Sequence, residues 1–334
     1  MNLRALPKIE LHLHLDCSLS YRAVSTLDPR VTREQYEREY MAPQKCTDLA
    51  EFLGCAVKGF QLMQTEDSLR LVVEDMFSQL AHDGVIYAEL RFAPLLHTAK
   101  GLTSERVVQT VETATDQMIR STGIEARVIL CTLRHFDRAQ SMQTAELVEK
   151  FRGGRVAALD IAGDEAGFPL DPHVSAYRFA MEKGLSRTAH AGEASGPESV
   201  WETLRLLQPT RVGHGTRSIE DPLLVTELKR ERIHLELCPS SNVQIIPSVE
   251  TWHEHPIDKL YRAGVALNVN TDTRMLTPTT LTHEYEGMKR VFGWGADELS
   301  HTNLMAIDAA FVDEEVKIRL RAKLAAGYHD APTL

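Results

Sequence analysis

Eight short apolar runs constrain the fold of this chain more than any other feature of its sequence. Each run is rich in β-branched or other apolar residues, and most are separated by roughly 20 to 40 residues with helical spacing. Regular alternation of strand and helix predicts parallel strands joined by right-handed crossovers. The runs are Ile9–His14, Val85–Phe92, Ala126–Thr132, Val156–Gly163, Ser186–His190, Arg211–Gly215, Ile233–Cys238 and Val265–Asp272.

Eight such units predict an α/β fold of the (β/α)8 TIM-barrel type. The alternative is an open, doubly wound sheet, but the number of strands favours the closed barrel. Barrels of this kind commonly reach this length as one domain. The chain has no internal repeat and no linker-like composition, so we expect a single domain over residues 1–334.

The stretch between the first and second runs breaks the alternation. Residues 18–84 contain no strand-like run, only helical segments such as Arg33–Tyr40, Asp48–Lys58 and Asp67–His82. An insertion after the first strand of a barrel lies on the face that carries the catalytic loops, so we expect a helical lid there. The C-terminal stretch Ala296–Tyr328 is expected to form helices that pack outside the barrel.

The composition excludes several classes of protein. The chain has 334 residues, of which 43% are hydrophobic and 25% charged, with a formal net charge of -10. Nucleic acid is therefore not expected as the main partner, because phosphate binding needs clustered Lys and Arg. The five cysteines form no CxxC pair, which argues against a disulfide framework and favours a reducing compartment. Without an apolar run of about 18 residues, we expect no membrane span and a cytoplasmic location.

Polar residues interrupt the apolar runs near their C-terminal ends. His12 and His14 alternate along the first run, so their side chains share one face. Taken singly, each such residue is more often a hydrogen-bonded structural residue than part of a site. Their common position at strand ends is what distinguishes them. The residues are His12, His14, His190, Glu193, His214 and Asp272.

The ends of barrel strands meet at one face, and the first and eighth strands become neighbours on closure. Three imidazoles and one carboxylate, from His12, His14, His190 and Asp272, suit Zn²⁺, with iron or manganese as alternatives. His214 and Glu193 would then lie beside the metal as groups for proton transfer. Motifs of other chemistries are absent: HExxH, GxSxG, the P-loop, GxGxxG after a strand, and the HxE…PCxxC signature of Cys-ligated deaminases.

Six segments, in the same order along the chain, resemble the adenosine deaminase family of the amidohydrolase superfamily. The resemblance spans nearly the whole chain. The segments are Pro7–Asp16, Leu159–Glu165, His190–Glu193, Gly213–Gly215, Cys238–Asn242 and Asn270–Asp272.

The resemblance implies a barrel with one catalytic Zn²⁺ per chain and hydrolytic deamination of a 6-aminopurine nucleoside, adenosine to inosine and ammonia. Carried over by motif, Glu193 would protonate the ring nitrogen next to the amino-bearing carbon, and His214 would orient the attacking water. The metal ligands would be His12, His14, His190 and Asp272. The substrate contacts would come from His14, Asp16 on the ribose side, the backbone of Gly163, and the position of Thr273.

Two positions depart from the family pattern. Cys17 replaces a glycine, and we expect it to be a packing residue, because the metal chemistry needs no thiolate. Thr273 stands where the family has an aspartate that contacts the purine, and Arg274 stands where the family has a proline. Losing that carboxylate predicts modest adenosine turnover or a preference for a modified aminopurine nucleoside. Arg274 is either a partner for a substrate carboxylate or a surface or salt-bridge residue.

Other functions remain open at this point. The same chemistry could act on adenine, on an adenine nucleotide, or on a modified nucleoside such as aminodeoxyfutalosine. A catalytically inactive purine-binding relative would have lost a metal ligand or Glu193, and this chain retains all of them. The sequence leaves the oligomeric state unknown.

Overall fold

The strands of the protein form one eight-stranded parallel sheet in which neighbours along the chain are neighbours in the sheet. The computed structural model describes residues 2–329. Its strands are β1 (Lys8–His14), β2 (Val85–Phe92), β3 (Glu125–Leu133), β4 (Val156–Ala162), β5 (Ser186–Ala191), β6 (Arg211–His214), β7 (His234–Leu237) and β8 (Leu267–Val269).

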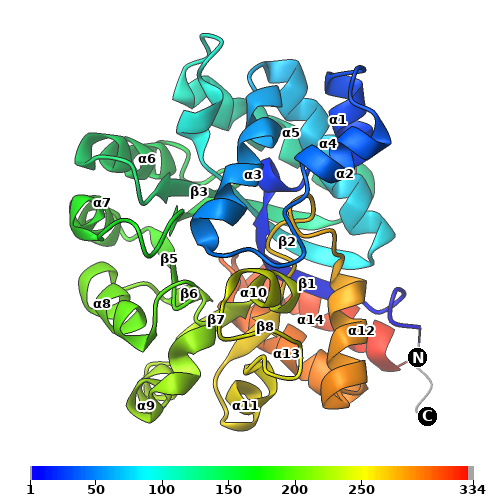
Figure 1. The fold of residues 1–334 in the computed structure, drawn as a ribbon, viewed down its shortest axis with the longest axis vertical. Coiled ribbons are helices and arrows are strands. Elements are labelled where there is room, and N and C mark those ends of the chain that lie inside the picture. The colour runs from blue at the N-terminus through cyan, green and yellow to red at the C-terminus, as the bar shows by residue number, and fades with distance from the viewer. Residues whose placement is uncertain (1, 330–334) are drawn as a thin grey trace.

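The sheet closes between β1 and the end of β8. Leu13 and Asp272 form a parallel bridge, and the backbone amide of His14 donates to the Asp272 carbonyl at 2.7 Å. The Asp272 amide in turn donates to the His12 carbonyl at 3.0 Å. Figure 1 shows the strands at the centre with helices around them. The predicted (β/α)8 TIM-type barrel is confirmed.

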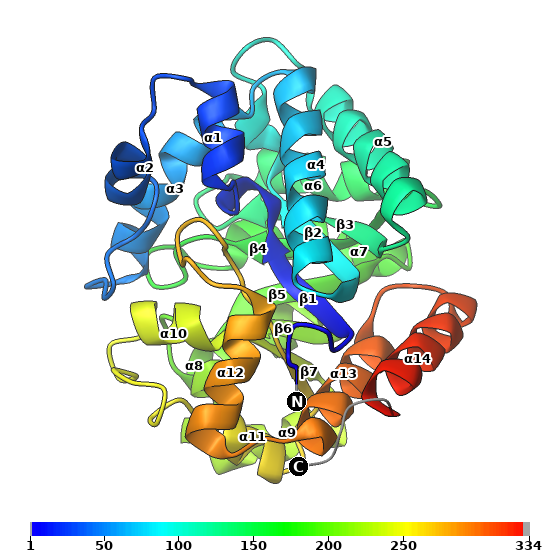
Figure 2. The ribbon, with the colours of Figure 1, turned by 90° about the vertical axis from the view of Figure 1, so that its right-hand side faces the viewer.

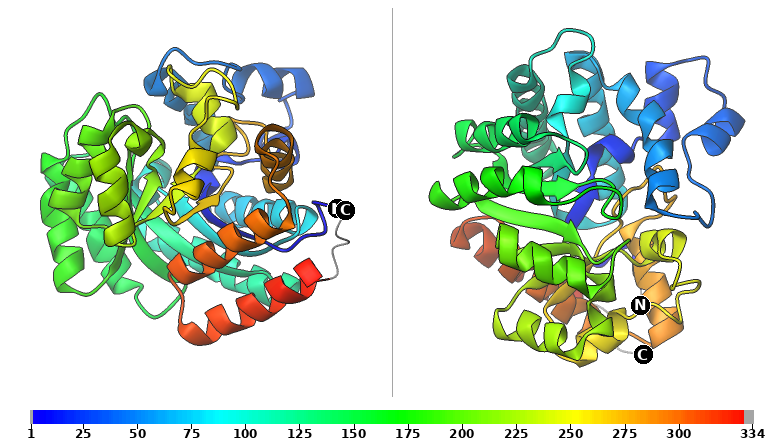
Figure 3. Two further views of the ribbon diagram at one scale, coloured as in Figure 1. Left: turned by 90° about the horizontal axis from the view of Figure 1, so that it is seen from below. Right: turned by 60° about the vertical axis from the view of Figure 1, so that its left-hand side comes forward.

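Helices follow the strands and cover the outside of the barrel (Figures 1 and 3). Their ends match local signals: Thr103 caps α5 through its side chain, and Gly123, at φ +72°, ends that helix. No helix among residues 2–329 is long and apolar enough to cross a membrane. The covering helices are α5 (Ser104–Thr122), α6 (Arg138–Lys150), α7 (Val174–Glu182), α8 (Pro197–Leu207), α9 (Pro222–Arg230), α10 (Pro239–Ile245), α11 (Ile257–Arg262), α12 (Leu281–Phe292), α13 (Ala296–Ala309) and α14 (Glu314–His329).

The stretch between β1 and β2 is helical, as expected, but its four helices have two roles. They are α1 (Tyr21–Leu27), α2 (Arg33–Glu39), α3 (Leu49–Leu62) and α4 (Glu66–His82). The last, α4, packs against β2 and α5 as the crossover helix of the first strand–helix unit. The first three lie together at one end of the barrel (Figure 2), so the insertion proper is α1 to α3.

Charged side chains fill the middle of the barrel, where large aliphatic residues are usual. Arg91, Asp160 and Glu236 are fully buried there, and so are Glu89 and Arg211. Buried charges of this kind are stable only when paired and hydrogen-bonded. The Arg91 guanidinium donates to both Asp160 (2.8 Å) and Glu236 (2.6 Å), and Arg211 pairs with Glu89 and Glu236. This charged layer lies directly beneath the candidate site.

Candidate metal and catalytic site

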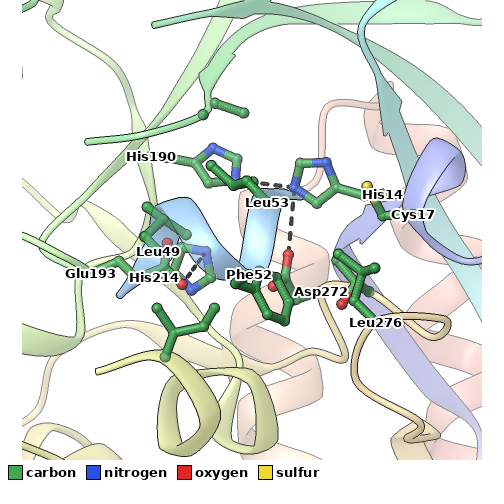
Figure 4. A pocket seen from close by; sticks show the side chains of 14 residues that line it. His14, Cys17, Leu49, Phe52, Leu53, His190, Glu193, His214, Asp272 and Leu276 are labelled. Carbon is green, nitrogen blue, oxygen red and sulfur yellow. Dashed lines mark hydrogen bonds and ion pairs between the residues drawn. The ribbon is translucent and has the colours of Figure 1, made fainter. Parts of the chain in front are cut away.

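Four predicted metal ligands converge at the C-terminal ends of the strands. His12 and His14 come from β1, His190 from β5, and Asp272 from the turn after β8, and their ligand atoms all lie within 4.8 Å of one another. The Nε2 atoms of His14 and His190 are 3.1 Å apart. Asp272 Oδ1 lies 3.3 Å from His12 Nε2 and 3.4 Å from His14 Nε2. Figure 4 shows His14, His190 and Asp272 pointing toward one another.

The protonation states of these groups fit a divalent cation. Burial lowers the pKa of His14 to about 3, and burial likewise lowers the pKa of His190. Burial would raise the pKa of Asp272, but the histidines close to it, His12, His214 and His14, outweigh this and hold it low. His12 Nε2 is buried and has no hydrogen-bond partner. Neutral imidazoles, an ionised carboxylate and an unpartnered nitrogen form a donor set suited to Zn²⁺.

A second set of ligand atoms overlaps the first. It combines His12 and Asp272 with His214 and Cys238. Burial raises the pKa of the Cys238 thiol well above its usual value, and Asp272 and Glu193 raise it further. The Cys238 Sγ also points to the backbone carbonyl of Glu236, 3.5 Å away. Because only the thiolate is a good ligand, the set with three histidines is the better metal site.

Two carboxylates of the charged layer orient the histidine ligands. Glu236 Oε2 lies 2.8 Å from His12 Nδ1, and the Asp160 carboxylate lies 3.2 Å from His190 Nδ1. With a proton on each Nδ1, both Nε2 atoms are left free to bind a metal. Arg91 bridges the two carboxylates. Sequence reasoning missed the role of these three residues, although each is a charged residue inside a buried strand.

Asp160→Asn is expected to weaken metal binding by about 10- to 100-fold, because the amide orients His190 less strongly and leaves Arg91 short of a charged partner. Competition with a chromophoric chelator measures the affinity. Asp221→Asn is a matched control, since Asp221 caps α9 and asparagine is an equally good cap. Equal affinities for wild type and Asp160→Asn would remove Asp160 from the support of the metal site.

Glu193 and His214 lie beside the four ligands as a second pair. Glu193 Oε1 is 3.5 Å from His214 Nε2, and both side chains are buried (Figure 4). Burial raises the pKa of Glu193 well above its usual value, and the charges of Asp272 and Glu165 raise it further. Burial and these two charges therefore favour the protonated form of Glu193, which has a proton to give.

The neighbouring Asn242 sets the tautomer of His214. Its side-chain nitrogen lies 3.0 Å from His214 Nδ1, while its oxygen accepts from the Thr216 hydroxyl at 2.8 Å. The amide therefore donates to Nδ1, and the imidazole proton is on Nε2, which faces Glu193. Burial lowers the pKa of His214 well below its usual value, so the ring is neutral. This neutral ring can donate one hydrogen bond into the site.

The candidate site is the polar floor of a cavity at the C-terminal ends of the strands. The insertion helix α3 supplies an apolar roof through Leu49, Phe52 and Leu53. No Lys or Arg is among the residues that line the cavity. The lining residues are His14, Cys17, Leu49, Phe52, Leu53, Ala162, Gly163, His190, Glu193, His214, Ile245, Asp272, Thr273 and Leu276.

The predicted substrate contacts lie in two places. His14, Gly163 and Thr273 line the cavity, and Gly163 has φ +99°, a backbone conformation that favours glycine. Asp16 is not among the lining residues. Its carboxylate accepts a hydrogen bond from the Ala93 amide at 3.1 Å and lies 3.7 Å from His97 Nε2. Substrate binding by Asp16 stays a prediction.

The two residues that depart from the family pattern have structural partners. Arg274 is buried, and its Nη2 lies 2.7 Å from Glu10 and 3.0 Å from Asp83. Both carboxylates already hold its charge, which supports the salt-bridge alternative, in a buried form, over a contact with a substrate carboxylate. Cys17 lines the cavity, and burial raises the pKa of its thiol well above its usual value, as expected of a packing residue.

Comparison with known proteins places the chain among deaminases. A curated adenosine deaminase of Haemophilus ducreyi is 35% identical over 96% of this chain and 96% of its own length. One from Clostridium acetobutylicum is 32% identical over 96% and 97%. These matches identify the chain as a deaminase-type hydrolase, in agreement with the six segments that resemble the family.

Solved structures give the same picture. The adenine deaminase of Arthrobacter aurescens superposes with a TM-score of 0.88 at 25% identity, covering 96% of this chain and 98% of the other. An amidohydrolase of Burkholderia ambifaria, solved with bound Zn, superposes with a TM-score of 0.89 at 26% identity, covering 98% of this chain and 92% of the other. The Arabidopsis ADAL protein in complex with GMP superposes with a TM-score of 0.85 at 25% identity, covering 97% of this chain and 98% of the other.

The family match extends over almost all of the barrel. The sequence profile of the family described as adenosine deaminase matches residues 7–327. This range includes all eight strands, the insertion α1 to α3 and every residue of the candidate site. The chain therefore belongs to the adenosine deaminase family.

Proposed function

We propose that the protein removes the amino group of an uncharged 6-aminopurine by hydrolysis of its C6–N bond. Adenosine is the first candidate substrate and adenine the second. The observation that carries this proposal is a buried Glu193, its pKa raised by burial, beside three histidines and an aspartate on the floor of one cavity. This arrangement provides a proton donor and a metal site within reach of the same bound ring.

His12, His14, His190 and Asp272 would hold the metal. A bound Zn²⁺ would lower the pKa of water from about 15.7 to about 7, which supplies a nucleophile at neutral pH. His214 Nε2–H would donate a hydrogen bond to the attacking oxygen and orient it toward the substrate. The Ser241 hydroxyl donates a hydrogen bond to Asp272 Oδ2 at 2.7 Å. This bond would fix the carboxylate so that Oδ1 faces the cluster.

Glu193 would give its proton to the purine nitrogen next to C6. The protonated ring draws electrons from C6, so water can add there and form a tetrahedral carbon with OH and NH2. The amino group then takes up a proton and leaves as ammonia, and the C6–O bond becomes a carbonyl. General acid catalysis of this kind is typically worth about 10²–10⁴-fold. The apolar roof of α3 would exclude bulk water from these steps.

The charge of the cavity favours a neutral substrate. A phosphate group would need cationic or amide donors, and no Lys or Arg lines this cavity. Adenosine and adenine need none. Adenine remains a candidate because Leu49, Phe52 and Leu53 present an apolar roof, and because a structural neighbour at 25% identity is an adenine deaminase. Since Arg274 is already paired, the cavity has no cation for a carboxylate-bearing nucleoside either.

A substrate panel tests this proposal. The zinc-loaded protein is incubated with adenosine, adenine, AMP and aminodeoxyfutalosine, and ammonia release is measured for each. We expect kcat/KM for adenosine or adenine to exceed that for AMP by at least about tenfold, since one unpaired charge in a buried site costs more than 1.4 kcal/mol. AMP as the best substrate would contradict the neutral-substrate proposal, and the absence of ammonia from all four would contradict deamination.

Thr273→Asp is expected to strengthen purine binding by about 1–3 kcal/mol, because a carboxyl group at this point of the cavity wall is a stronger partner for a ring nitrogen than a hydroxyl. KM for adenosine and the inhibition constant of inosine measure the change. Thr273→Asn is the matched control, with the same shape and no charge. Efficient turnover of adenosine by the wild type, unimproved in Thr273→Asp, would show that the missing carboxylate does not limit specificity.

A further inference from the structure

Glu165, in the loop that follows β4, accepts an unusual number of hydrogen bonds from one short segment. That segment, residues 192–195, lies between β5 and α8 and contains Glu193. Oε2 of Glu165 accepts from the backbone amides of Glu193 (3.0 Å), Ala194 (2.8 Å) and Ser195 (3.0 Å). Oε1 accepts from the Gly192 amide (2.7 Å) and the Ser199 hydroxyl (2.6 Å). The carboxylate is buried, at 7% exposure.

These bonds are not the usual capping of a helix. The helix α8 begins at Pro197 after Gly196, and the amides held by Glu165 all precede it. Gly192 has φ +70°, which turns consecutive N–H groups toward the same side. Successive amides arranged in this way form a concave site for an anion. Glu165 is the anion that fills it, from a strand end elsewhere in the chain.

The carbonyl side of the segment is held as well. The Arg217 amide donates to the Gly192 carbonyl at 2.9 Å, and the Arg217 guanidinium donates to the Ala194 carbonyl at 3.3 Å. Both the amide and the carbonyl groups of residues 192–195 are therefore hydrogen-bonded to residues outside the segment. Glu193 lies within this segment, so the position of its backbone depends directly on Glu165.

The position of Glu193 matters because its carboxyl group faces His214 at 3.5 Å in the candidate cavity. A shift of the backbone would move this carboxyl relative to any ring bound beneath α3. The negative charge of Glu165 also contributes, after burial and Asp272, to the raised pKa of Glu193. Loss of Glu165 would thus disturb both the place and the protonation of the proton donor.

We propose that Glu165 is a positioning residue, whose carboxylate clamps residues 192–195 and holds the Glu193 side chain in line with the substrate. This inference rests on the proposed function of Glu193 as the proton donor. It assigns no contact with substrate or metal to Glu165.

Glu165→Gln tests the proposal, because glutamine has nearly the same shape but only one oxygen to accept the amides. Hydrogen exchange of residues 192–195 should become faster by about tenfold or more as the segment opens locally. In the same protein kcat should fall by about 10- to 100-fold, with KM within about threefold of wild type and zinc content unchanged, as expected for a misplaced catalytic group.

Two further variants make the test specific. Glu202→Gln is the matched control: Glu202 is a half-buried glutamate of α8 that is not among the hydrogen-bond partners of residues 192–195, so exchange and kcat should stay at wild-type values. Ser199→Ala removes one donor to Glu165 without changing the clamped backbone. It should speed hydrogen exchange of residues 192–195 slightly and lower kcat severalfold. If Glu165→Gln fails to fold, this variant still tests the proposal.

Wild-type exchange rates in Glu165→Gln would overturn the proposal, and so would faster exchange with unchanged kcat. Loss of zinc together with kcat would also contradict it, because a general collapse of the site is then the cause. These results differ from failure of the proposed function, in which the wild-type protein itself releases no ammonia from the aminopurines. The exchange measurement tests the clamp in that case too.

Discussion

Glu193→Gln is expected to lower kcat by about 10²–10⁴-fold while the metal content of the protein stays at the wild-type level. Glutamine keeps the shape of the side chain but has no acidic proton to give to the purine ring. Glu193 is not one of the four residues that form the metal cluster, so zinc should remain bound. Steady-state kinetics and elemental analysis of the same preparation measure both quantities.

Glu198→Gln is the control for this variant, since Glu198 is a glutamate of the first turn of α8 that does not line the cavity. Near-normal kcat in Glu193→Gln would exclude Glu193 as the proton donor. Loss of zinc in that variant would instead make Glu193 part of the metal site.

The pH dependence of the wild-type enzyme follows from the same carboxyl group. The reaction needs Glu193 protonated, and burial, Asp272 and Glu165 raise its pKa well above the usual value. Activity should therefore persist above the usual pKa of a glutamate and fall as the pH rises through this raised pKa. A profile of kcat in which activity already declines near pH 4.5 would show that Glu193 is not held in its protonated form.

His190→Ala and Asp272→Ala should each lose bound metal and activity together. Each variant removes one of four donors, and Asp272 also supplies the negative charge that faces the histidines. Metal content after dialysis and ammonia release from adenosine should both fall to a small fraction of the wild-type values. His253→Ala, at an exposed histidine, is the control. Full metal content in either variant would show that the residue is not a ligand.

Much of the fold follows from the sequence because the strands are buried on both faces. All eight predicted strands are present, and most boundaries differ by one or two residues. The last strand is shorter than expected, Leu267–Val269, because the chain turns after it and Asp272 takes a positive φ of 64°. Helical spacing alone did not separate α4, the first crossover helix, from the true insertion α1 to α3.

Sequence reasoning identified the candidate metal ligands, but it did not identify the buried charged residues that hydrogen-bond to them from below. His12 and His190 lie in the C-terminal halves of recognisable strands and Asp272 follows another, and the barrel topology brings them together. The pairing of Arg91 with Asp160 and Glu236 joins positions 69 and 145 residues apart, which no local pattern reveals. The two partners of the buried Arg274 salt bridge could not be named from the sequence for the same reason, since Glu10 and Asp83 come from distant elements.

Glu165 shows a different limit. It belongs to one of the segments that resemble the family, yet its partners are backbone amides, and backbone amides leave no trace in residue types. Its role becomes visible only once the conformation of residues 192–195 is known.

Mass analysis of the product formed from adenosine in water labelled with heavy oxygen tests the central claim most directly. If Glu193 and the four-residue metal cluster carry out hydrolytic deamination, the zinc-loaded protein converts adenosine to inosine with one solvent oxygen at C6, and the Glu193→Gln variant does so only at a greatly reduced rate. Unlabelled product, or no deaminated product from either adenosine or adenine with a fully zinc-loaded protein, would contradict this account.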